Sequence, residues 1–397
     1  MSPQRSVRGT SPAKGWRPRP FRQFVVKMHS RCDLKCRYCY VYNSMDQSWK
    51  QRPRRISNDV IAHIAARIAE HAHRHRLNSV HLVLHGGEPL LAGVEHIRHL
   101  VTSTTDAAGP AVRVGVSLQT NGIKLDDRFL QVFHELGVRV GVSLDGDAAA
   151  HDLHRRHPDG RGSHSAVLSA LTLLTERYQH LFGGLLCTVD LRNDPLTTFE
   201  SLVHFDPPAV DFLLPHGNWA SPPPGRTADP RATPYADWLI PIFDRWYRSK
   251  GTRTEVRLFA DIIHLLLGGD SSSEAVGLAP SRMVVIETDG SIEQTDTLKS
   301  AYPGAPATGF HVARDPFDAL FQHPAIMARQ IGEEALAAEC RACPVKRACG
   351  GGLYTHRYDP RNGFANPSVY CADLLRLISH IRETVARDIA TLSEGRR

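Results

Sequence analysis

Short apolar runs alternate with helical patterns through the first half of the chain, and this alternation restricts the fold more than any other feature. Six runs have the length and composition of buried strands: 24–28, 80–84, 112–118, 138–144, 185–189 and 210–214. Helical patterns separate most of them: 59–76, with Ser57 or Asn58 as its cap, 94–105, 127–136 and 164–178. Repeated βα units predict an α/β fold with a parallel sheet and helices outside it. Six units predict a partial (β/α)6 barrel with ligands at the carboxyl ends of the strands.

The 397 residues are long for one domain and suggest a catalytic domain with an appended module. Proline and glycine concentrate at 221–225, where we expect the barrel to end, and the chain changes after Met283 to short strands, turns and cysteines. The predicted organisation is a basic, disordered tail at 1–20, the barrel at 21–225, a helical connection at 226–280 and a cysteine-bearing domain at 281–397. An amphipathic helix is expected at 372–392.

Composition excludes several classes of protein. Hydrophobic residues make up 42% of the chain, which is too many for a mainly disordered protein. No apolar run is long enough to span a bilayer, and residues 1–20 lack the apolar segment of a secretory signal, so we expect no membrane contact and a cytoplasmic location. No aromatic-rich basic stripe indicates a nucleic-acid partner. Histidines 71, 73 and 75 lie in a polar helical stretch and are expected to face water.

The eight cysteines form two clusters and one isolated residue. Three lie between 32 and 39, four lie between 340 and 371, and Cys187 stands in the apolar run 185–191, where it is expected to be a core residue. Tight clusters in a chain expected in the cytoplasm favour metal binding over disulfides.

The first cluster, Cys32, Cys36 and Cys39, has C-x3-C-x2-C spacing directly after the first predicted strand. Three thiolates on one loop can ligate three irons of a [4Fe–4S] cluster, which leaves the fourth iron open to a small molecule. Ordinary electron-transfer clusters use four cysteines. A structural zinc site is the alternative, but it also needs a fourth ligand, which His29 could supply.

The first cluster and the aromatic Tyr38 before its last cysteine resemble the motif of the radical S-adenosylmethionine (SAM) superfamily. Further matches follow the next strands in order: Gly86, Gly87, Glu88 and Pro89, then Thr120 and Asn121, then Ser143 and Asp145, and finally Arg155. The resemblance implies that these residues bind SAM, that Glu88 compensates its amino group and that Arg155 meets its carboxylate. It also implies that SAM occupies the open iron. Electrons then come from a donor such as flavodoxin or ferredoxin, and cleavage of SAM yields a 5′-deoxyadenosyl radical.

The second cluster, Cys340, Cys343, Cys349 and Cys371, can complete one [4Fe–4S] cluster or one zinc site, and spacing alone does not separate them. In this context it resembles the SPASM extension of radical SAM peptide maturases, which usually carries seven cysteines and two auxiliary clusters. Thr295 and Leu353 stand at two of the cysteine positions of the other auxiliary cluster, and Ser281 lies near the third. We therefore expect one auxiliary [4Fe–4S] cluster, and two clusters in all.

Asp296 follows the vacated position at Thr295. The resemblance to sulfatase-maturing enzymes implies that an aspartate there is a general base. An ordinary turn aspartate after a hairpin is the alternative.

The SPASM-like region implies a precursor peptide as the substrate. The stretch 284–299, with a single auxiliary cluster, resembles the cyclophane-forming (FxsB-type) maturases of ribosomal peptides, and the resemblance spans residues 21–371. It implies a C–C crosslink between an aromatic ring and the β-carbon of a nearby residue. Formylglycine formation, as in sulfatase maturation, is the first alternative and thioether formation the second. A zinc-stabilised peptide-binding module is the non-enzymatic alternative.

Overall fold

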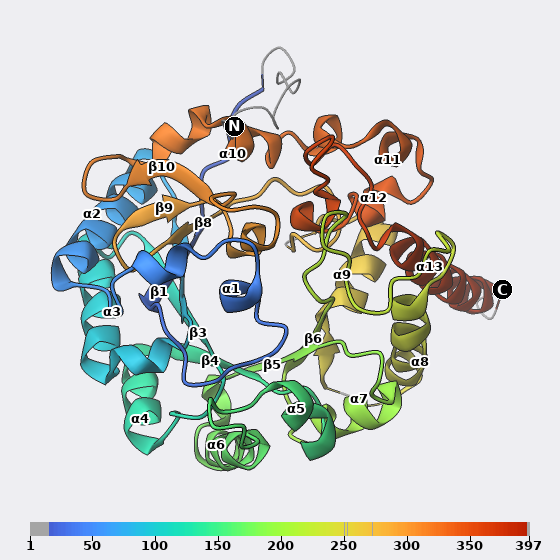
Figure 1. Ribbon diagram of the computed structural model, residues 1–397, viewed down its shortest axis with the longest axis horizontal. Coiled ribbons are helices and arrows are strands. Elements are labelled where there is room, and N and C mark those ends of the chain that lie inside the picture. Colours follow the sequence, from blue (N-terminus) through green and yellow to red (C-terminus); the bar gives the residue numbers. More distant parts are fainter. Residues whose placement is uncertain (1–15, 250, 252, 272, 395–397) are drawn as a thin grey trace.

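The computed structural model describes residues 16–249, 251, 253–271 and 273–394, and one ten-stranded sheet curves through it (Figure 1). The strand order is β10-β9-β8-β1-β2-β3-β4-β5-β6-β7. The strands are β1 (Gln23–His29), β2 (Ser79–Gly86), β3 (Arg113–Thr120), β4 (Val138–Ser143), β5 (Phe182–Thr188), β6 (Ala209–Leu213), β7 (Glu255–Val256), β8 (Met283–Ile286), β9 (Ser291–Glu293) and β10 (Ala307–His311). Neighbours from β8 through β1 to β7 are parallel, whereas β9 pairs antiparallel with β8 and β10.

Helices surround the outer face of this sheet, and the short α1 lies at the centre of the ring (Figure 1). They are α1 (Tyr40–Asn43), α2 (Asn58–Arg74), α3 (Val94–Ala108), α4 (Asp127–Leu136), α5 (Ala148–His154), α6 (His164–Arg177), α7 (Pro195–Val203), α8 (Pro234–Arg248), α9 (Arg257–Leu266), α10 (Pro324–Ala328), α11 (Ala338–Ala342), α12 (Lys346–Cys349) and α13 (Cys371–Glu394). The predicted α/β class and the partial barrel of six parallel strands, β1 to β6, are confirmed. The predicted cap is also confirmed, because the Ser57 side chain accepts a hydrogen bond from the Val60 amide at 3.3 Å.

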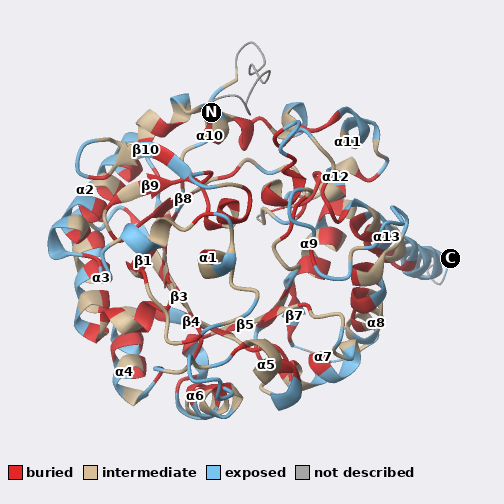
Figure 2. Cartoon of the chain, in the orientation of Figure 1, coloured by how far each residue is buried: buried red, intermediate tan, exposed pale blue. Residues whose placement is uncertain are grey.

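Strand alternation gives the barrel a packed outside and a polar inside. On β2, Val80, Leu82 and Leu84 are buried against the helices, while His81 and His85 point into the barrel and line its cavity. The burial pattern is visible along the strands and the inner helix faces (Figure 2). Because successive side chains of a strand point to opposite faces, the same alternation that builds the core places polar groups around the cavity.

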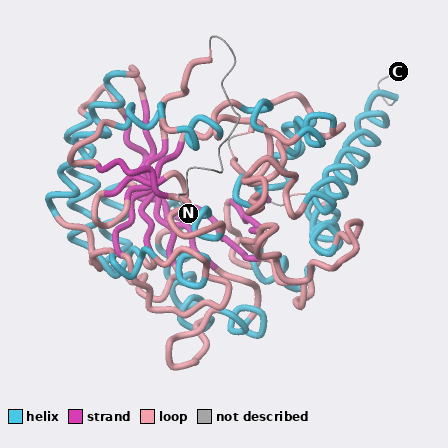
Figure 3. The backbone as a smooth tube through the Cα atoms, turned by 45° about the horizontal axis from the view of Figure 1, so that its top comes forward, coloured by secondary structure: helices cyan, strands magenta, loops and turns pink. Residues whose placement is uncertain are grey.

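The predicted domain boundaries at 225/226 and 280/281 both fall within this one sheet. β7 pairs with β6, and β8 pairs with β1, so that Phe24 lies between Leu82 of β2 and Val284 of β8. The strands stand side by side in a single fan, with the C-terminal helix away from it (Figure 3). The cysteine-bearing region is therefore joined to the barrel through backbone hydrogen bonds to β1.

Residues 1–15 of the predicted tail lie outside the described residues. The side chain of Gln330 fixes the backbone of Arg19. The Arg19 amide donates to Gln330 Oε1 at 3.0 Å, and the Arg19 carbonyl accepts from Gln330 Nε2 at 3.0 Å. In the described part of the chain, no helix combines the length and the apolar character that crossing a membrane requires.

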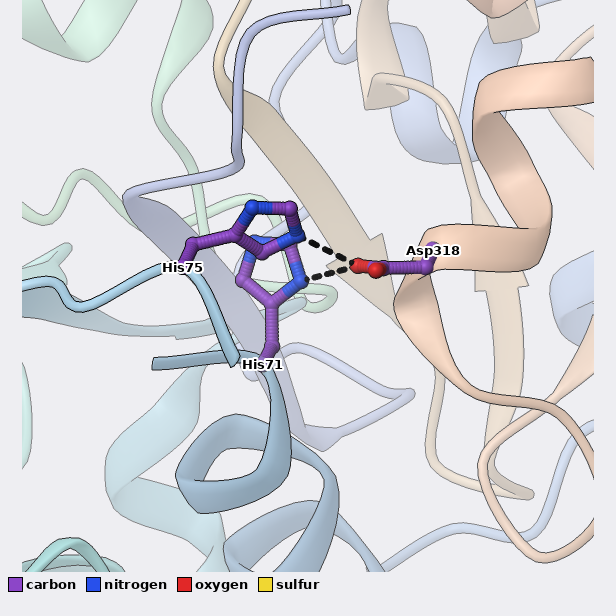
Figure 4. A group of neighbouring side chains, drawn as sticks. All are labelled: His71, His75 and Asp318. Atoms are coloured by element: carbon purple, nitrogen blue, oxygen red, sulfur yellow. Dashed lines mark hydrogen bonds and ion pairs between the residues drawn. The ribbon is translucent and has the colours of Figure 1, made fainter. Parts of the chain in front are cut away.

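The expectation that histidines 71, 73 and 75 face water is wrong for His71. Figure 4 shows His71 and His75 directed at one oxygen of Asp318, with Nδ1 and Nε2 at 2.7 and 2.8 Å from Oδ1. The His71 ring packs against Phe21 at 5.7 Å and is 2% exposed. The periodicity of α2 alone could not show this, since Asp318 comes from a 3-10 turn (Phe317–Gln322) far along the chain.

Asp318→Ala is expected to lower the melting temperature measurably. The substitution leaves the buried Nδ1 of His71 without a partner, which costs about 1–3 kcal/mol. Asp244→Ala is the matched control, because Asp244 bonds His380 at 2.8 Å with both side chains about 30% exposed. Equal melting temperatures for the two variants would show that the His71–Asp318 contact contributes nothing.

Candidate active site

The first three cysteines lie on the loop that follows β1 and face one large cavity inside the barrel. The cavity has a volume of about 880 Å³ and is lined by Cys32, Cys36 and Cys39. Two contacts fix the position of this loop. The Lys35 amide donates a hydrogen bond to the Arg156 carbonyl at 2.7 Å, and the Leu34 side chain is buried. The three thiols therefore converge through the fold, without any disulfide.

These three thiols fit an iron–sulfur cluster in which one iron has no protein ligand. Burial raises the pKa of Cys36 to about 11 and also raises the pKa values of Cys32 and Cys39. Iron binding deprotonates coordinating thiols, so loading the site releases protons. Among the described residues that line the cavity there is no fourth cysteine. The donor set fits a [4Fe–4S] cluster with three protein ligands.

The loop after β2 is pressed against the cysteine loop. The Gly87 amide donates to the His29 carbonyl at 2.8 Å, and the Glu88 amide donates to the Arg31 carbonyl at 3.0 Å. A Cβ on Gly87 would lie 1.8 Å from the Tyr42 hydroxyl, so only glycine fits there. The close approach places the backbone of this loop at the cavity wall.

Glu88 is buried at the junction of β2 and β3. Its carboxylate accepts hydrogen bonds from the Thr120 hydroxyl at 2.8 Å, the Asn121 amide at 2.8 Å and the Leu90 amide at 3.0 Å. Burial nevertheless raises its pKa to about 7. A buried carboxylate with this pKa is prepared to receive a cationic ligand group, which would hold it ionised.

Asp145 organises the opposite wall. Its carboxylate accepts hydrogen bonds from the Tyr38 hydroxyl, from Arg155 Nε at 2.9 Å and from the Thr188 amide at 3.0 Å. Ser143 accepts from Gln119 Nε2 at 3.0 Å. The structure thus gathers the predicted SAM-site residues, and eight line the cavity directly: Tyr38, Gly86, Gly87, Glu88, Thr120, Asn121, Ser143 and Arg155. Pro89 and Asp145 stand behind them.

Asp296 begins a 3-10 turn (Asp296–Ser300) after β9 and is buried, with 5% of its surface exposed. It forms an ion pair with Lys27 of β1, and His85 Nδ1 lies 3.7 Å from the same oxygen. Burial alone raises the pKa of Asp296, but the neighbouring cations, Lys27 first, outweigh it and hold that pKa below its ordinary value. His85 lines the cavity, so Asp296 lies one side chain behind the wall.

Lys27 and His85 were not predicted as site residues. A lysine within the apolar strand 24–28 is the signal that could have drawn attention to this position, because a buried lysine requires a partner. Glu287 and Glu293 also lie near Asp296, and Lys299 Nζ occupies the space between them at 3.0 and 3.1 Å. Together with Lys27 on Asp296 and Arg52 on Glu293, that lysine neutralises the acidic group, so these carboxylates do not indicate a metal site.

The four remaining clustered cysteines also converge. Cys340, Cys343, Cys349 and Cys371 line a second cavity of about 70 Å³. Burial raises the pKa of Cys349 to about 12, with the Cys371 thiol adding to it. Four thiols around one small space fit a [4Fe–4S] cluster and also fit zinc.

The positions where cysteines of the other auxiliary cluster are expected hold Thr295, Leu353 and Ser281, none of which offers a thiol. The nearby interior is a separate core in which Tyr354 stacks on Phe364 at 4.3 Å and Tyr358 packs on Tyr302 at 5.2 Å. In the described part of the chain, therefore, one four-cysteine site is present.

Comparison with known proteins finds a family match and several similar enzymes. Residues 26–200 match the family model of the Radical SAM superfamily. The chain is 27% identical over 349 residues to the serine-type anaerobic sulfatase-maturating enzyme of Klebsiella aerogenes, with 85% of this chain and 81% of that enzyme covered. It is 25% identical over 359 residues to the cysteine-type anaerobic sulfatase-maturating enzyme of Clostridium perfringens, with 89% and 94% covered.

A solved structure shares the fold over nearly the whole chain. Native anSMEcpe with bound AdoMet aligns with a TM-score of 0.78 at 22% identity and covers 92% of this chain and 98% of its own. These matches do not support the predicted closeness to cyclophane-forming maturases, and the relatives covering most of the chain carry the name of the first alternative. The family match therefore shows a radical SAM domain at residues 26–200, and the protein is an enzyme.

Proposed function

We propose that this enzyme is a maturase that removes a hydrogen atom from a side-chain β-carbon of a peptide or protein. The observation that carries the proposal is the position of Asp296, an ionised carboxylate buried behind the wall of the cavity onto which Cys32, Cys36 and Cys39 open. A two-electron oxidation of a side chain needs a proton acceptor at this place. The names of the relatives that match most of the chain support a protein or peptide as the substrate.

The residues of the cavity fit the cofactors that the family implies. Cys32, Cys36 and Cys39 would hold a [4Fe–4S] cluster, and SAM would bind between Glu88 and Arg155. Glu88 would meet the amino group of SAM, and Arg155, held by Asp145 at 2.9 Å, would meet its carboxylate. When bound, these groups supply a 5′-deoxyadenosyl radical. An external reductant such as flavodoxin or ferredoxin would provide the electron.

The chain's own residues would then complete the oxidation. Once a hydrogen atom has left the β-carbon, the substrate must lose one more electron and one proton. Asp296 would accept the proton, with Lys27 keeping the carboxylate ionised beforehand. The electron would pass to an auxiliary [4Fe–4S] cluster on Cys340, Cys343, Cys349 and Cys371, whose thiols converge on one cavity.

Two products are consistent with the loss of one hydrogen atom, one electron and one proton from the substrate. The sequence motifs at 284–299 favour a C–C crosslink, in which the β-carbon joins an aromatic ring carbon and the two carbons lose one hydrogen each. The relatives that match most of the chain favour the second candidate, formylglycine. A serine side chain reaches this aldehyde by losing two hydrogens, and a cysteine side chain does so when water then replaces its sulfur, which leaves as sulfide. Both begin with the same β-hydrogen and both use Asp296.

Co-expression with a short open reading frame sought beside the gene, followed by tandem mass spectrometry, tests the proposal. A crosslink lowers the mass by two hydrogens and suppresses backbone cleavage between the joined residues. Formylglycine from serine gives the same mass loss but leaves a linear fragment ladder and an aldehyde, while formylglycine from cysteine also replaces the sulfur. An unmodified peptide, equal to one co-expressed with a Cys36→Ala variant, would contradict the maturase function.

A further inference from the structure

Four aromatic rings connect the two cysteine sites. Tyr40 directly follows Cys39 of the first site, and Tyr370 directly precedes Cys371 of the second. Two histidines stand between them, His216 after β6 and His356 in a 3-10 turn (Tyr354–Arg357). The ring centroids are separated by 4.6 Å from Tyr40 to His216, 5.8 Å from His216 to His356 and 4.9 Å from His356 to Tyr370.

The series of rings is enclosed and fixed in place. His356 and Tyr370 are 4% and 1% exposed, and the Tyr370 hydroxyl donates to the Pro215 carbonyl at 2.5 Å, next to His216. At the other end, Tyr40 and His216 line the reaction cavity. The rings therefore run from the cavity to the buried Tyr370, whose backbone is joined to Cys371 of the second site.

The two histidines have no other evident task. His216 Nδ1 and His356 Nε2 are buried without a hydrogen-bond partner among the described residues. Burial lowers the pKa of His216 to about 4 and the pKa of His356 well below its ordinary value, so both rings are neutral at neutral pH. Burying unpaired polar rings is costly, and apolar side chains of similar size would avoid that cost.

We infer that Tyr40, His216, His356 and Tyr370 form an electron-transfer route between the reaction cavity and the auxiliary cluster. The inference rests on the proposed function, because it needs iron rather than zinc on the four cysteines. In the proposed oxidation, the substrate radical would give up one electron to an auxiliary cluster on the four cysteines and one proton to Asp296. Delocalised rings in near contact carry an electron more readily than saturated side chains. In the enzymes that this chain resembles, the other auxiliary cluster is ligated by cysteines at the positions of Thr295 and Leu353. This chain has no cysteine at either position, so an electron needs another path.

A test without any peptide uses SAM as the electron acceptor. Reconstituted enzyme is fully reduced, freed of reductant and mixed with SAM under anaerobic conditions. Each electron passed to SAM releases one methionine, and the adenosyl radical takes a hydrogen atom from the buffer. The first equivalent of methionine uses the electron at the SAM-binding cluster, and a second equivalent must draw the electron of the auxiliary cluster through the rings. The wild type is expected to form both, with the paramagnetic resonance signal of the reduced auxiliary cluster disappearing as the second equivalent forms.

His356→Leu removes the central ring, and His356→Phe keeps one. In the leucine variant, we expect an unchanged first equivalent and a second slowed roughly tenfold or more, which corresponds to a barrier higher by about 1.4 kcal/mol. The auxiliary signal should persist. The phenylalanine variant keeps an aromatic ring at this position and should return toward the wild-type rate. Iron content is measured in all three proteins.

Wild-type rates in a fully iron-loaded His356→Leu variant would overturn the route. A wild type that has the auxiliary signal but stops at one equivalent would overturn it as well. Absence of that signal in the reduced wild type would instead show that the four cysteines hold no auxiliary cluster. That result would remove both the route and the proposed electron acceptor.

Discussion

Replacing Cys32, Cys36 and Cys39 together by alanine is expected to abolish SAM cleavage and to halve the bound iron. The wild type should hold two [4Fe–4S] clusters, or about eight irons per chain. The triple variant loses every thiol that faces the barrel cavity but keeps the four that line the second cavity. The measurements are iron content after anaerobic reconstitution and release of 5′-deoxyadenosine from SAM.

Cys187→Ala is the matched control for that loss. Cys187 is 1% exposed in the apolar core and lines neither cysteine cavity, so the variant should keep its iron and cleave SAM normally. Stoichiometric zinc together with one cluster's worth of iron in the native protein would contradict the assignment of the second site.

Asp296→Asn is expected to separate SAM cleavage from product formation. The variant removes the proton acceptor but none of the seven clustered cysteines and none of the residues that line the SAM cavity, so both clusters and SAM cleavage should survive. Product formation should fall by about 10²–10⁴-fold, the usual effect of losing a general base. Product and 5′-deoxyadenosine are quantified in the same reaction.

Asp289→Asn is the control from the same hairpin. Asp289 pairs with Arg52 and its side chain is 31% exposed, so its loss should leave product formation near normal. Near-normal product from Asp296→Asn as well would make Asp296 a turn residue.

Lys27→Met adds a pH dependence with a defined sign. Without the lysine, burial becomes the dominant influence and the pKa of Asp296 rises. The carboxylate is then ionised only at higher pH, so product formation should be impaired at neutral pH and recover as the pH increases. A loss that does not change with pH would contradict the role given to Lys27.

Local patterns predicted the parts of the fold that depend on local sequence. The strand at 80–84 and a serine cap before the helix that begins at Asn58 are properties of a few neighbouring residues, and the structure contains both. The pairing of β8 with β1 could not be predicted this way, because it joins residues about 260 positions apart in a parallel register that no local signal sets. The predicted domain boundaries at 225/226 and 280/281 lie between β1 and β8 in the sequence. They were drawn from composition, which does not show strand pairing.

The candidate site was likewise predicted only in part. Cysteine spacing and the glycine loop pointed to the two groups of thiols and to most of the predicted residues that line the barrel cavity, since each motif is a short segment with its own chemistry. The sequence did not predict the contacts that connect these segments, such as Lys27 with Asp296. It also did not predict the contact of His71 with Asp318, which lies outside the site. Each brings together side chains from distant elements, so their existence depends on packing rather than on spacing.

Transfer of deuterium tests the central claim, that the enzyme takes a hydrogen atom from a peptide β-carbon, most directly. The precursor peptide is prepared with deuterium on the β-carbon of the residue that becomes modified, and the isolated 5′-deoxyadenosine is analysed by mass spectrometry after a single turnover. The account predicts one deuterium in 5′-deoxyadenosine, because that β-carbon bond is the one the radical breaks. Label that appears only when the α-carbon is deuterated would contradict the claim and indicate α-carbon chemistry, as in thioether formation.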